Sequence, residues 1–176
     1  MKTINDWLVY VIAPQMYDYQ PSLKRDDQEL TSLVDFVGKI VLDIGSGTGR
    51  LAFLAAQNAF AVYPVEPVAN LRLYIKAKAN DLGLNNIYPV DGLATDIPFQ
   101  DNFADITLGG HVFGDNPEEE RRELERVTKL GGMVILCPGN NDKDNLAHKV
   151  LTTNGYSWSR FEEPEDGWKR EYWKTI

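Results

Sequence analysis

A glycine-rich segment, Gly45-Ser46-Gly47-Thr48-Gly49, directly follows the apolar run Ile40–Ile44 and precedes a stretch rich in Ala and Leu. Glycines at this spacing let the backbone turn sharply and approach a ligand closely, because no Cβ stands in the way. The start of the following helix adds oriented N–H groups. The spacing reads G-x-G-x-G, whereas dinucleotide-binding loops read G-x-G-x-x-G. The alternative is a purely structural role, in which the segment is a tight strand–helix turn without a ligand.

Two acidic residues accompany this loop. Asp43 lies two residues before the first glycine. A carboxylate there would oppose a pyrophosphate but suit a cationic ligand that carries an ammonium or a sulfonium. Glu66 ends the next apolar run and precedes Pro67. Alone, such a residue is typical of a solvated acid, but one β-α-β unit after a glycine loop it can accept hydrogen bonds from both hydroxyls of a ribose.

The elements that must position these residues alternate between strand and helix, which indicates a mostly parallel sheet with helices on its faces. Short apolar runs predict strands, and an apolar residue every third or fourth position predicts helices. A helix start is marked at Asn116-Pro117, and Gly131-Gly132 is expected to end that helix. The expected strands are Ile40–Ile44, Phe60–Val65, Ile87–Val90, Ala104–Leu108, Met133–Cys137 and a terminal antiparallel hairpin of Tyr156–Glu162 and Trp168–Lys174.

Composition narrows the function classes. The chain has 176 residues and a net charge of −8, which favours one domain and disfavours a nucleic-acid partner, since phosphate binding needs a basic surface. One cysteine and two histidines allow no internal disulfide and leave little for a metal site, so we expect no metal. No apolar run approaches the roughly 20 residues of a membrane span. We therefore expect a cytoplasmic protein without a membrane partner.

From about residue 38 onward the chain strongly resembles the class I S-adenosylmethionine-dependent methyltransferases. Four segments carry the resemblance in the family's order, and the combination is more specific than any one of them. They are Val41–Gly49, Val65–Pro67, Gly92–Asp105 and Arg126–Gly132. The resemblance implies an α/β Rossmann-like three-layer sandwich with a mostly parallel seven-stranded sheet and one antiparallel strand in the edge region. It also implies a single domain over residues 1–176, in which helices within 1–37 cover the site and 38–176 form the cofactor-binding core.

The resemblance assigns roles to individual residues in binding S-adenosylmethionine. Asp43 would lie near the amino group, and Glu66 would bind the ribose hydroxyls. Near the adenine, Pro67 would make contact, and Ala94 would offer its backbone. Leu93 stands where the family commonly has an acid that binds the adenine amino group, which leaves Asp91 and Thr95 as alternatives. The methionine part and nearby ribose would be lined by the loop residues Gly45, Ser46, Gly47 and Gly49.

Residues that contact the methyl acceptor are less marked, because methyl transfer needs mainly alignment, and a base only when the acceptor loses a proton. His111 follows Gly109-Gly110 at a strand end. It is the candidate catalytic residue that positions or deprotonates the acceptor, with a polar rim residue as the alternative. Tyr17, Tyr19 and Asp115 are candidates for the acceptor site, with packing and a helix start as their structural alternatives.

These observations predict a methyltransferase that uses S-adenosylmethionine. The acceptor is expected to be a small molecule, because the chain is little more than a cofactor-binding core and is acidic; a protein acceptor and the oligomeric state stay open. Two alternatives belong to other classes. One is a nicotinamide-dependent oxidoreductase, which the glycine spacing and Asp43 disfavour. The other is a domain that binds the cofactor or a protein partner without catalysis.

Overall fold

Six strands and six helices make up the part of the chain that the computed structural model describes, residues 11–18, 28–138, 142–163 and 167–176. The strands are β1 (Ile40–Ile44), β2 (Ala61–Val65), β3 (Ala104–Gly110), β4 (Thr128–Cys137), β5 (Ser157–Glu163) and β6 (Gly167–Thr175). The helices are α2 (Gln15–Asp18), α3 (Gln28–Leu33), α4 (Arg50–Ala56), α5 (Ala69–Asp81), α6 (Pro117–Val127) and α7 (Leu146–Thr153).

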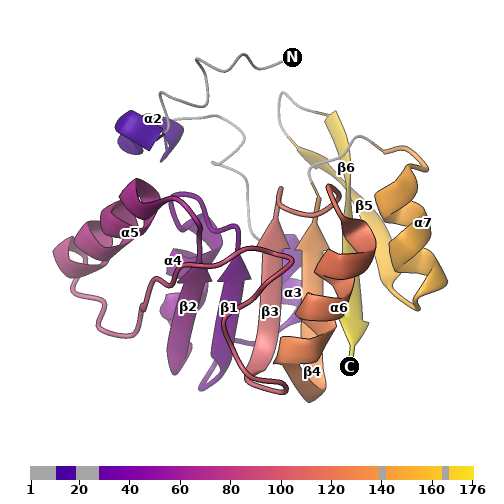
Figure 1. Ribbon diagram of the computed structural model, residues 1–176, viewed down its shortest axis with the longest axis horizontal. Coiled ribbons are helices and arrows are strands. Elements are labelled where there is room, and N and C mark those ends of the chain that lie inside the picture. Colours follow the sequence, from indigo (N-terminus) through magenta and orange to yellow (C-terminus); the bar gives the residue numbers. More distant parts are fainter. Residues whose placement is uncertain (1–10, 19–27, 139–141, 164–166) are drawn as a thin grey trace.

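The strands form one sheet in the order β2-β1-β3-β4-β6-β5 (Figure 1). The pairs β1–β2, β1–β3 and β3–β4 are parallel, whereas β6 is antiparallel to both β4 and β5. The mostly parallel sheet with one antiparallel strand is thus confirmed. The antiparallel strand lies one position in from the edge, and β5 forms the edge itself.

The expectation of seven strands is not confirmed, because the segment Ile87–Val90 forms only isolated parallel bridges with β2. The Tyr88 N–H donates to the Val62 carbonyl at 2.9 Å, and the Val90 N–H donates to the Pro64 carbonyl at 2.8 Å. Proline has no N–H, so Pro64 cannot return a bond to this segment. The ladder is interrupted at Pro64, and the segment lies against β2 without completing a strand.

The predicted end of the helix that starts at Pro117 is wrong. α6 ends at Val127, and β4 begins at Thr128. Gly131, with a φ of 79°, lies where the pairing of β3 with β4 shifts its register. Its N–H donates to the carbonyl of Ile176 at 2.7 Å. The glycine pair therefore belongs to an irregularity within β4, stabilised by the chain's last residue.

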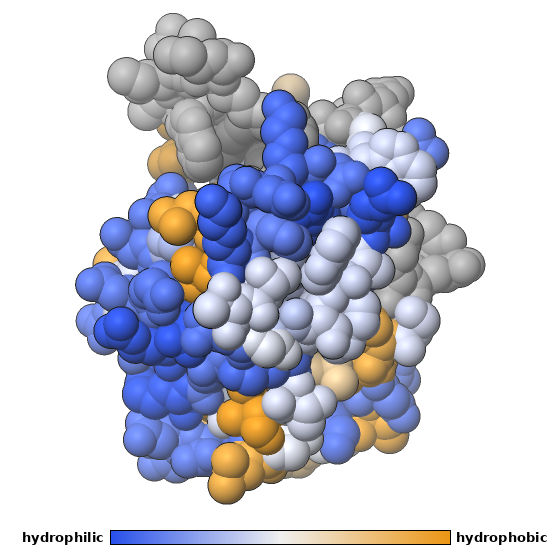
Figure 2. Space-filling view, turned by 90° about the vertical axis from the view of Figure 1, so that its right-hand side faces the viewer, coloured by the Kyte–Doolittle hydropathy of each residue, from blue (hydrophilic) through white to orange (hydrophobic). Residues whose placement is uncertain are grey.

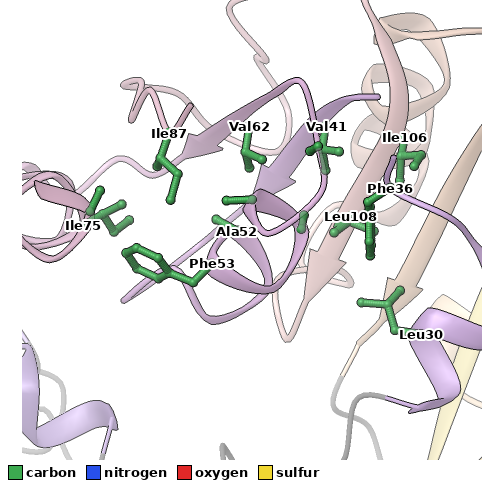
Figure 3. Close-up of a cluster of buried hydrophobic side chains, with 14 of the residues drawn as sticks. Leu30, Phe36, Val41, Ala52, Phe53, Val62, Ile75, Ile87, Ile106 and Leu108 are labelled. Carbon is green, nitrogen blue, oxygen red and sulfur yellow. The ribbon is translucent and has the colours of Figure 1, made fainter. Parts of the chain in front are cut away.

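Alternating side chains of the strands pack against helices on both faces. Val41 of β1 belongs to one buried cluster with residues of α3, α4 and α5, and the neighbouring Leu42 belongs to a second cluster with residues of α6 and α7. Figure 1 shows α6 in front of the sheet and α3 and α4 behind it. In Figure 3, Val62 and Ile106 of the sheet lie on the same side as Ala52 and Phe53 of α4. This three-layer arrangement agrees with the predicted fold class.

The β5–β6 hairpin is held to the rest of the fold by a charged group. Arg170 of β6 donates to Asp142 at 2.6 Å and to Asp144 at 2.8 Å, and its guanidinium lies 4.6 Å from the ring centre of Trp158. These bonds join the hairpin to the segment between β4 and α7. Figure 2 shows this side of the molecule, where hydrophilic residues predominate and apolar ones form small separate groups.

No helix among the described residues has the length and apolar character that crossing a membrane requires.

Candidate functional site

The glycine loop between β1 and α4 has a backbone that only glycine adopts readily. Gly45, Gly47 and Gly49 have φ values of 63°, 57° and 84°. A Cβ added at Gly45 would lie 2.6 Å from Cβ of Val112, closer than real carbon atoms approach each other. The Gly45 N–H also donates to the Val65 carbonyl at 2.8 Å. The loop is therefore fixed between β2 and the residues that follow β3.

Asp43 lies beneath this loop and is 2% exposed. Its Oδ2 accepts a hydrogen bond from the Ala52 N–H at 3.1 Å. Burial raises the pKa of Asp43 to about 7, against the opposing influence of that N–H and of the positive charge of Arg50. A buried carboxylate of this kind gains stability when a cation approaches it.

Glu66 at the end of β2 is 5% exposed and joins two parts of the site. Its Oε2 accepts from the Gly47 N–H at 2.9 Å, and its Oε1 accepts from the Val68 N–H at 3.0 Å. Burial raises the pKa of Glu66, and these two N–H groups oppose that rise. A carboxylate has about four lone-pair positions, so acceptor positions remain for two hydroxyl groups.

A small cavity lies above the loop and is lined by Asp43, by residues 45–48 and by Gly110 and His111 from the end of β3. Within the described part of the chain, the buried hydroxyl oxygen of Ser46 has no hydrogen-bond partner. A buried polar atom without a partner is costly unless a ligand or water satisfies it. The loop thus combines a backbone cradle, an unsatisfied hydroxyl and two buried carboxylates, a donor set that fits a cationic ligand with ribose hydroxyls.

The residues predicted near an adenine lie on the β2 side. Pro67 is exposed, and Leu93 is 53% exposed in a turn in which it and Asp96 exchange backbone hydrogen bonds of 3.3 and 3.1 Å. Ala94 packs against the buried cluster beneath α6. The Glu66 N–H donates to the Val90 carbonyl at 3.0 Å, which brings the segment before this turn alongside the ribose acid.

Arg72 of α5 is a residue of this region that sequence reasoning missed. Its Nη1 donates to the carbonyl oxygens of Glu66 and Pro67 at 2.7 and 2.8 Å, and its Nη2 lies 3.2 Å from the Asp91 carboxylate. Arg72 therefore holds the end of β2 against the segment that leads to the turn. A basic residue six positions after a strand-end acid, on the helix that follows that strand, is the signal that would have found it.

His111 lies at the carboxyl end of β3, where the structure brings it beside the glycine loop. It is exposed, has a left-handed φ of 60°, and its N–H donates to the Cys137 carbonyl at 2.7 Å. Together with Asp115 and Asn145 it also lines a second cavity of about 370 Å³. His111 thus separates the cavity at the glycine loop from a larger one between the loops that follow β3 and β4.

Glu120 holds the loop that carries Asp115, and its role is visible only in the structure. It is 3% exposed, and its two carboxylate oxygens accept from the N–H groups of Gly114 at 2.7 Å and Asn116 at 3.0 Å. From the sequence we predict only the helix start at Asn116-Pro117. An acid four residues after an Asn at a helix start is related to the capping box, in which the acid lies three residues on.

The structure describes only the backbone of one of the two predicted tyrosines. Tyr17 belongs to α2, but its side chain lies outside the described residues, as does the whole of Tyr19. The neighbouring Asp18 accepts from the Tyr74 hydroxyl at 2.8 Å and from Lys78 Nζ at 2.6 Å, both on α5. Burial raises the pKa of Asp18, but these hydrogen bonds outweigh burial and hold it below the ordinary value. They fasten α2 next to α5 (Figure 1).

The described residues include no group of three or more His, Cys, Asp or Glu side chains that could hold a metal ion.

Comparison with known proteins gives a family match over more than half of the chain. The family model described as "Methyltransferase domain" matches residues 42–136. An uncharacterized methyltransferase of Mycobacterium leprae (strain TN) is 35% identical over 108 residues, 57% of this chain and 37% of that protein. The demethylmenaquinone methyltransferase of Geobacillus kaustophilus is 31% identical over 103 residues, 56% of this chain and 44% of that protein. The chain thus spans less than half the length of these curated relatives.

Among solved structures, a SAM-dependent methyltransferase from Aquifex aeolicus superposes with a TM-score of 0.69. It is 19% identical, and the match covers 91% of this chain and 94% of that one. At this identity the likeness concerns the fold.

Proposed function

The chain belongs to the methyltransferase domain family, and on that premise we propose that it binds S-adenosylmethionine at the glycine loop and transfers the methyl group to an acceptor beside His111. The observation that carries the proposal is the bond of 2.9 Å between Glu66 Oε2 and the Gly47 N–H, because it brings the ribose acid to the glycine loop. When bound, S-adenosylmethionine supplies a methyl group on a positively charged sulfur.

In this proposal each residue of the site contacts a different part of the cofactor. Glu66 accepts hydrogen bonds from the ribose hydroxyls with its free lone pairs. Asp43 balances the charge of the amino group, and Ser46 satisfies its buried hydroxyl on the methionine part. Ala94 and Pro67 border the adenine, where Leu93 offers an apolar contact in place of an acid. The buried carboxylate of Asp43 disfavours the pyrophosphate of a nicotinamide dinucleotide, whereas Glu66 would suit the ribose of either cofactor.

We place the proposed acceptor on the side of His111 that faces away from the glycine loop. The cavity of about 370 Å³ there lies within the range of about 300–1,000 Å³ typical of small-molecule sites. Its polar side chains include Asp115 and Asn145. We infer a small polar acceptor that His111 orients toward the methyl group and, when the acceptor must lose a proton, deprotonates. We propose that α2 lies over the cofactor side of the site, which the bonds of Asp18 to α5 support.

Calorimetric titration with S-adenosylhomocysteine and, separately, with NAD tests the cofactor. Saturable binding of S-adenosylhomocysteine alone is expected. Binding of NAD alone would support the oxidoreductase, and binding of neither by folded protein would overturn the proposal.

Catalysis is tested by following the formation of S-adenosylhomocysteine from S-adenosylmethionine with panels of small polar acceptors. Turnover with one of them is expected. Tight cofactor binding without turnover across the panels would favour the non-catalytic binding domain.

A further inference from the structure

A third cavity, of about 620 Å³, lies between α5 and residues 84–89, on the outer side of the sheet edge beyond β2. Its volume also lies within the range of about 300–1,000 Å³ of small-molecule sites. It shares no lining residue with the cavity at the glycine loop. We call it the α5 groove. It adjoins the cofactor site at Arg72, which lines the groove and also holds the end of β2.

The chemistry of the α5 groove contrasts with that of the protein as a whole. The chain has 26 acidic and 18 basic residues. Yet the described residues that line the groove include Arg72, Lys76 and two side-chain amides, of Asn80 and Asn85, and no acid. Leu73 and Tyr88, 64% and 48% exposed, supply apolar surface at its walls. A positively charged hollow with apolar walls is complementary to an anion that carries an apolar body.

The two basic residues of the groove are not equally available to a ligand. Arg72 already forms an ion pair with Asp91 and donates hydrogen bonds to the carbonyls at the end of β2. Lys76, one helical turn further on, is exposed and forms no ion pair with any residue that the structure describes. Lys76 is therefore the cation that an incoming anion would meet.

The sheet edge beside the groove argues for a small ligand over an extended peptide. Addition of a peptide strand needs a row of free N–H and C=O groups along the edge. Here Pro89, between Tyr88 and Val90 whose N–H groups point inward to β2, has no N–H to offer on the outward side. The edge lacks the regular donors of a strand ladder, whereas the hollow between it and α5 is open.

We propose that the α5 groove binds a small organic anion, a carboxylate, sulfonate or phosphate attached to an apolar or aromatic body, with Lys76 as its charge partner. The walls at Leu73 and Tyr88 contact the apolar body, and the amides of Asn80 and Asn85 are placed to donate to the anionic group.

The test uses 8-anilinonaphthalene-1-sulfonate, an anionic aromatic dye, and its uncharged relative N-phenyl-1-naphthylamine. Fluorescence titration of the full chain is expected to show one saturable site for the sulfonate and much weaker binding of the uncharged dye. Lys76→Glu and, independently, Leu73→Glu are expected to raise the dissociation constant of the sulfonate at least tenfold. Both positions are exposed, so the variants should keep the unfolding midpoint of the wild type.

Lys149→Glu on α7 is the matched control, since it makes the same charge change at another exposed helix position. The proposal predicts less than a twofold change for it. Equal weakening in Lys149→Glu and Lys76→Glu, equal affinity for both dyes, or no saturable binding would overturn the proposal. Displacement of the dye by poly-L-glutamate at concentrations below those of small carboxylates or phosphates would assign the groove to an acidic protein partner and would also overturn it.

Discussion

The two halves of the carboxyl edge of the sheet are built in different ways. On the β1–β2 side, Asp43 and Glu66 are buried and bind backbone N–H groups of the adjoining loop and helix. On the β3–β4 side, His111 and Asp115 are exposed, and their loop is held from beneath by Glu120. The first half is a rigid, charged cradle, whereas the second presents polar side chains on a supported loop. The difference is consistent with the proposal of a cofactor on the first half and an acceptor on the second.

The largest loss of stability is expected at Gly45, where the glycine loop needs a left-handed backbone. Gly45→Ala places a methyl group against Val112 at a left-handed position, and overpacking of about 1–3 kcal/mol adds to about 1–2 kcal/mol of backbone strain. We expect a loss of about 2–5 kcal/mol in the free energy of unfolding in urea. Gly38→Ala is the control, because Gly38 has a φ of 69° but open space around it. Equal losses in the two variants would show that Val112 does not confine the loop.

Asp43 should make the stability of the unliganded protein depend on pH. Its folded pKa of about 7 lies above the ordinary value of 3.8, so the folded state binds more protons between these values. Stability is therefore highest below about pH 4 for this group and falls as pH rises toward 7, by up to about 4 kcal/mol.

Asp43→Asn should remove that decline while keeping the bond from Ala52. Urea unfolding at several pH values between 4 and 8 measures it. The variant should exceed the wild type in stability above pH 7 yet bind S-adenosylhomocysteine more weakly. If the free energy of unfolding changed with pH in the same way in wild type and Asp43→Asn, burial of the Asp43 carboxylate would not be the cause of the decline.

A smaller effect is expected on the acceptor side. Glu120→Ala leaves two backbone N–H groups without their acceptor and should cost about 1–3 kcal/mol of stability. The affinity for S-adenosylhomocysteine should change less than threefold, because both N–H groups that Glu120 binds belong to the acceptor loop. Glu119→Ala at the neighbouring exposed position is the control for helix effects. A tenfold loss of cofactor affinity in Glu120→Ala would contradict the separation of the two halves.

The smallest effect on the fold is expected at His111. His111→Asn keeps a residue that tolerates the left-handed backbone but cannot take a proton at neutral pH. The free energy of unfolding and the dissociation constant of S-adenosylhomocysteine should both stay within twofold of the wild-type values, while the rate of methyl transfer to the native acceptor falls. An unchanged rate would remove His111 from the reaction.

The same contrast explains how much of the molecule could be predicted from its sequence. The glycine loop, Glu66 and the helix start at Pro117 depend on local patterns, and the structure places them as elements in the predicted order. The contact of Arg170 with Asp142 joins residues 28 apart in the sequence, which no local pattern marks. The contacts of Glu120 depart by one residue from the usual capping box. The interruption at Pro64 could have been predicted from the sequence, because a proline has no N–H to donate to a neighbouring strand. The α5 groove joins a helix face to a later segment, which no short motif marks.

Glu66 offers the most direct test of the central claim, that the buried acids and the glycine loop form a cradle for S-adenosylmethionine. The measurement is the dissociation constant of S-adenosylhomocysteine, by calorimetry, for wild type, Glu66→Ala and the exposed control Glu119→Ala. The account predicts saturable binding that Glu66→Ala weakens at least tenfold, about 1.4 kcal/mol, and that Glu119→Ala changes far less. An unchanged dissociation constant in folded Glu66→Ala would contradict it.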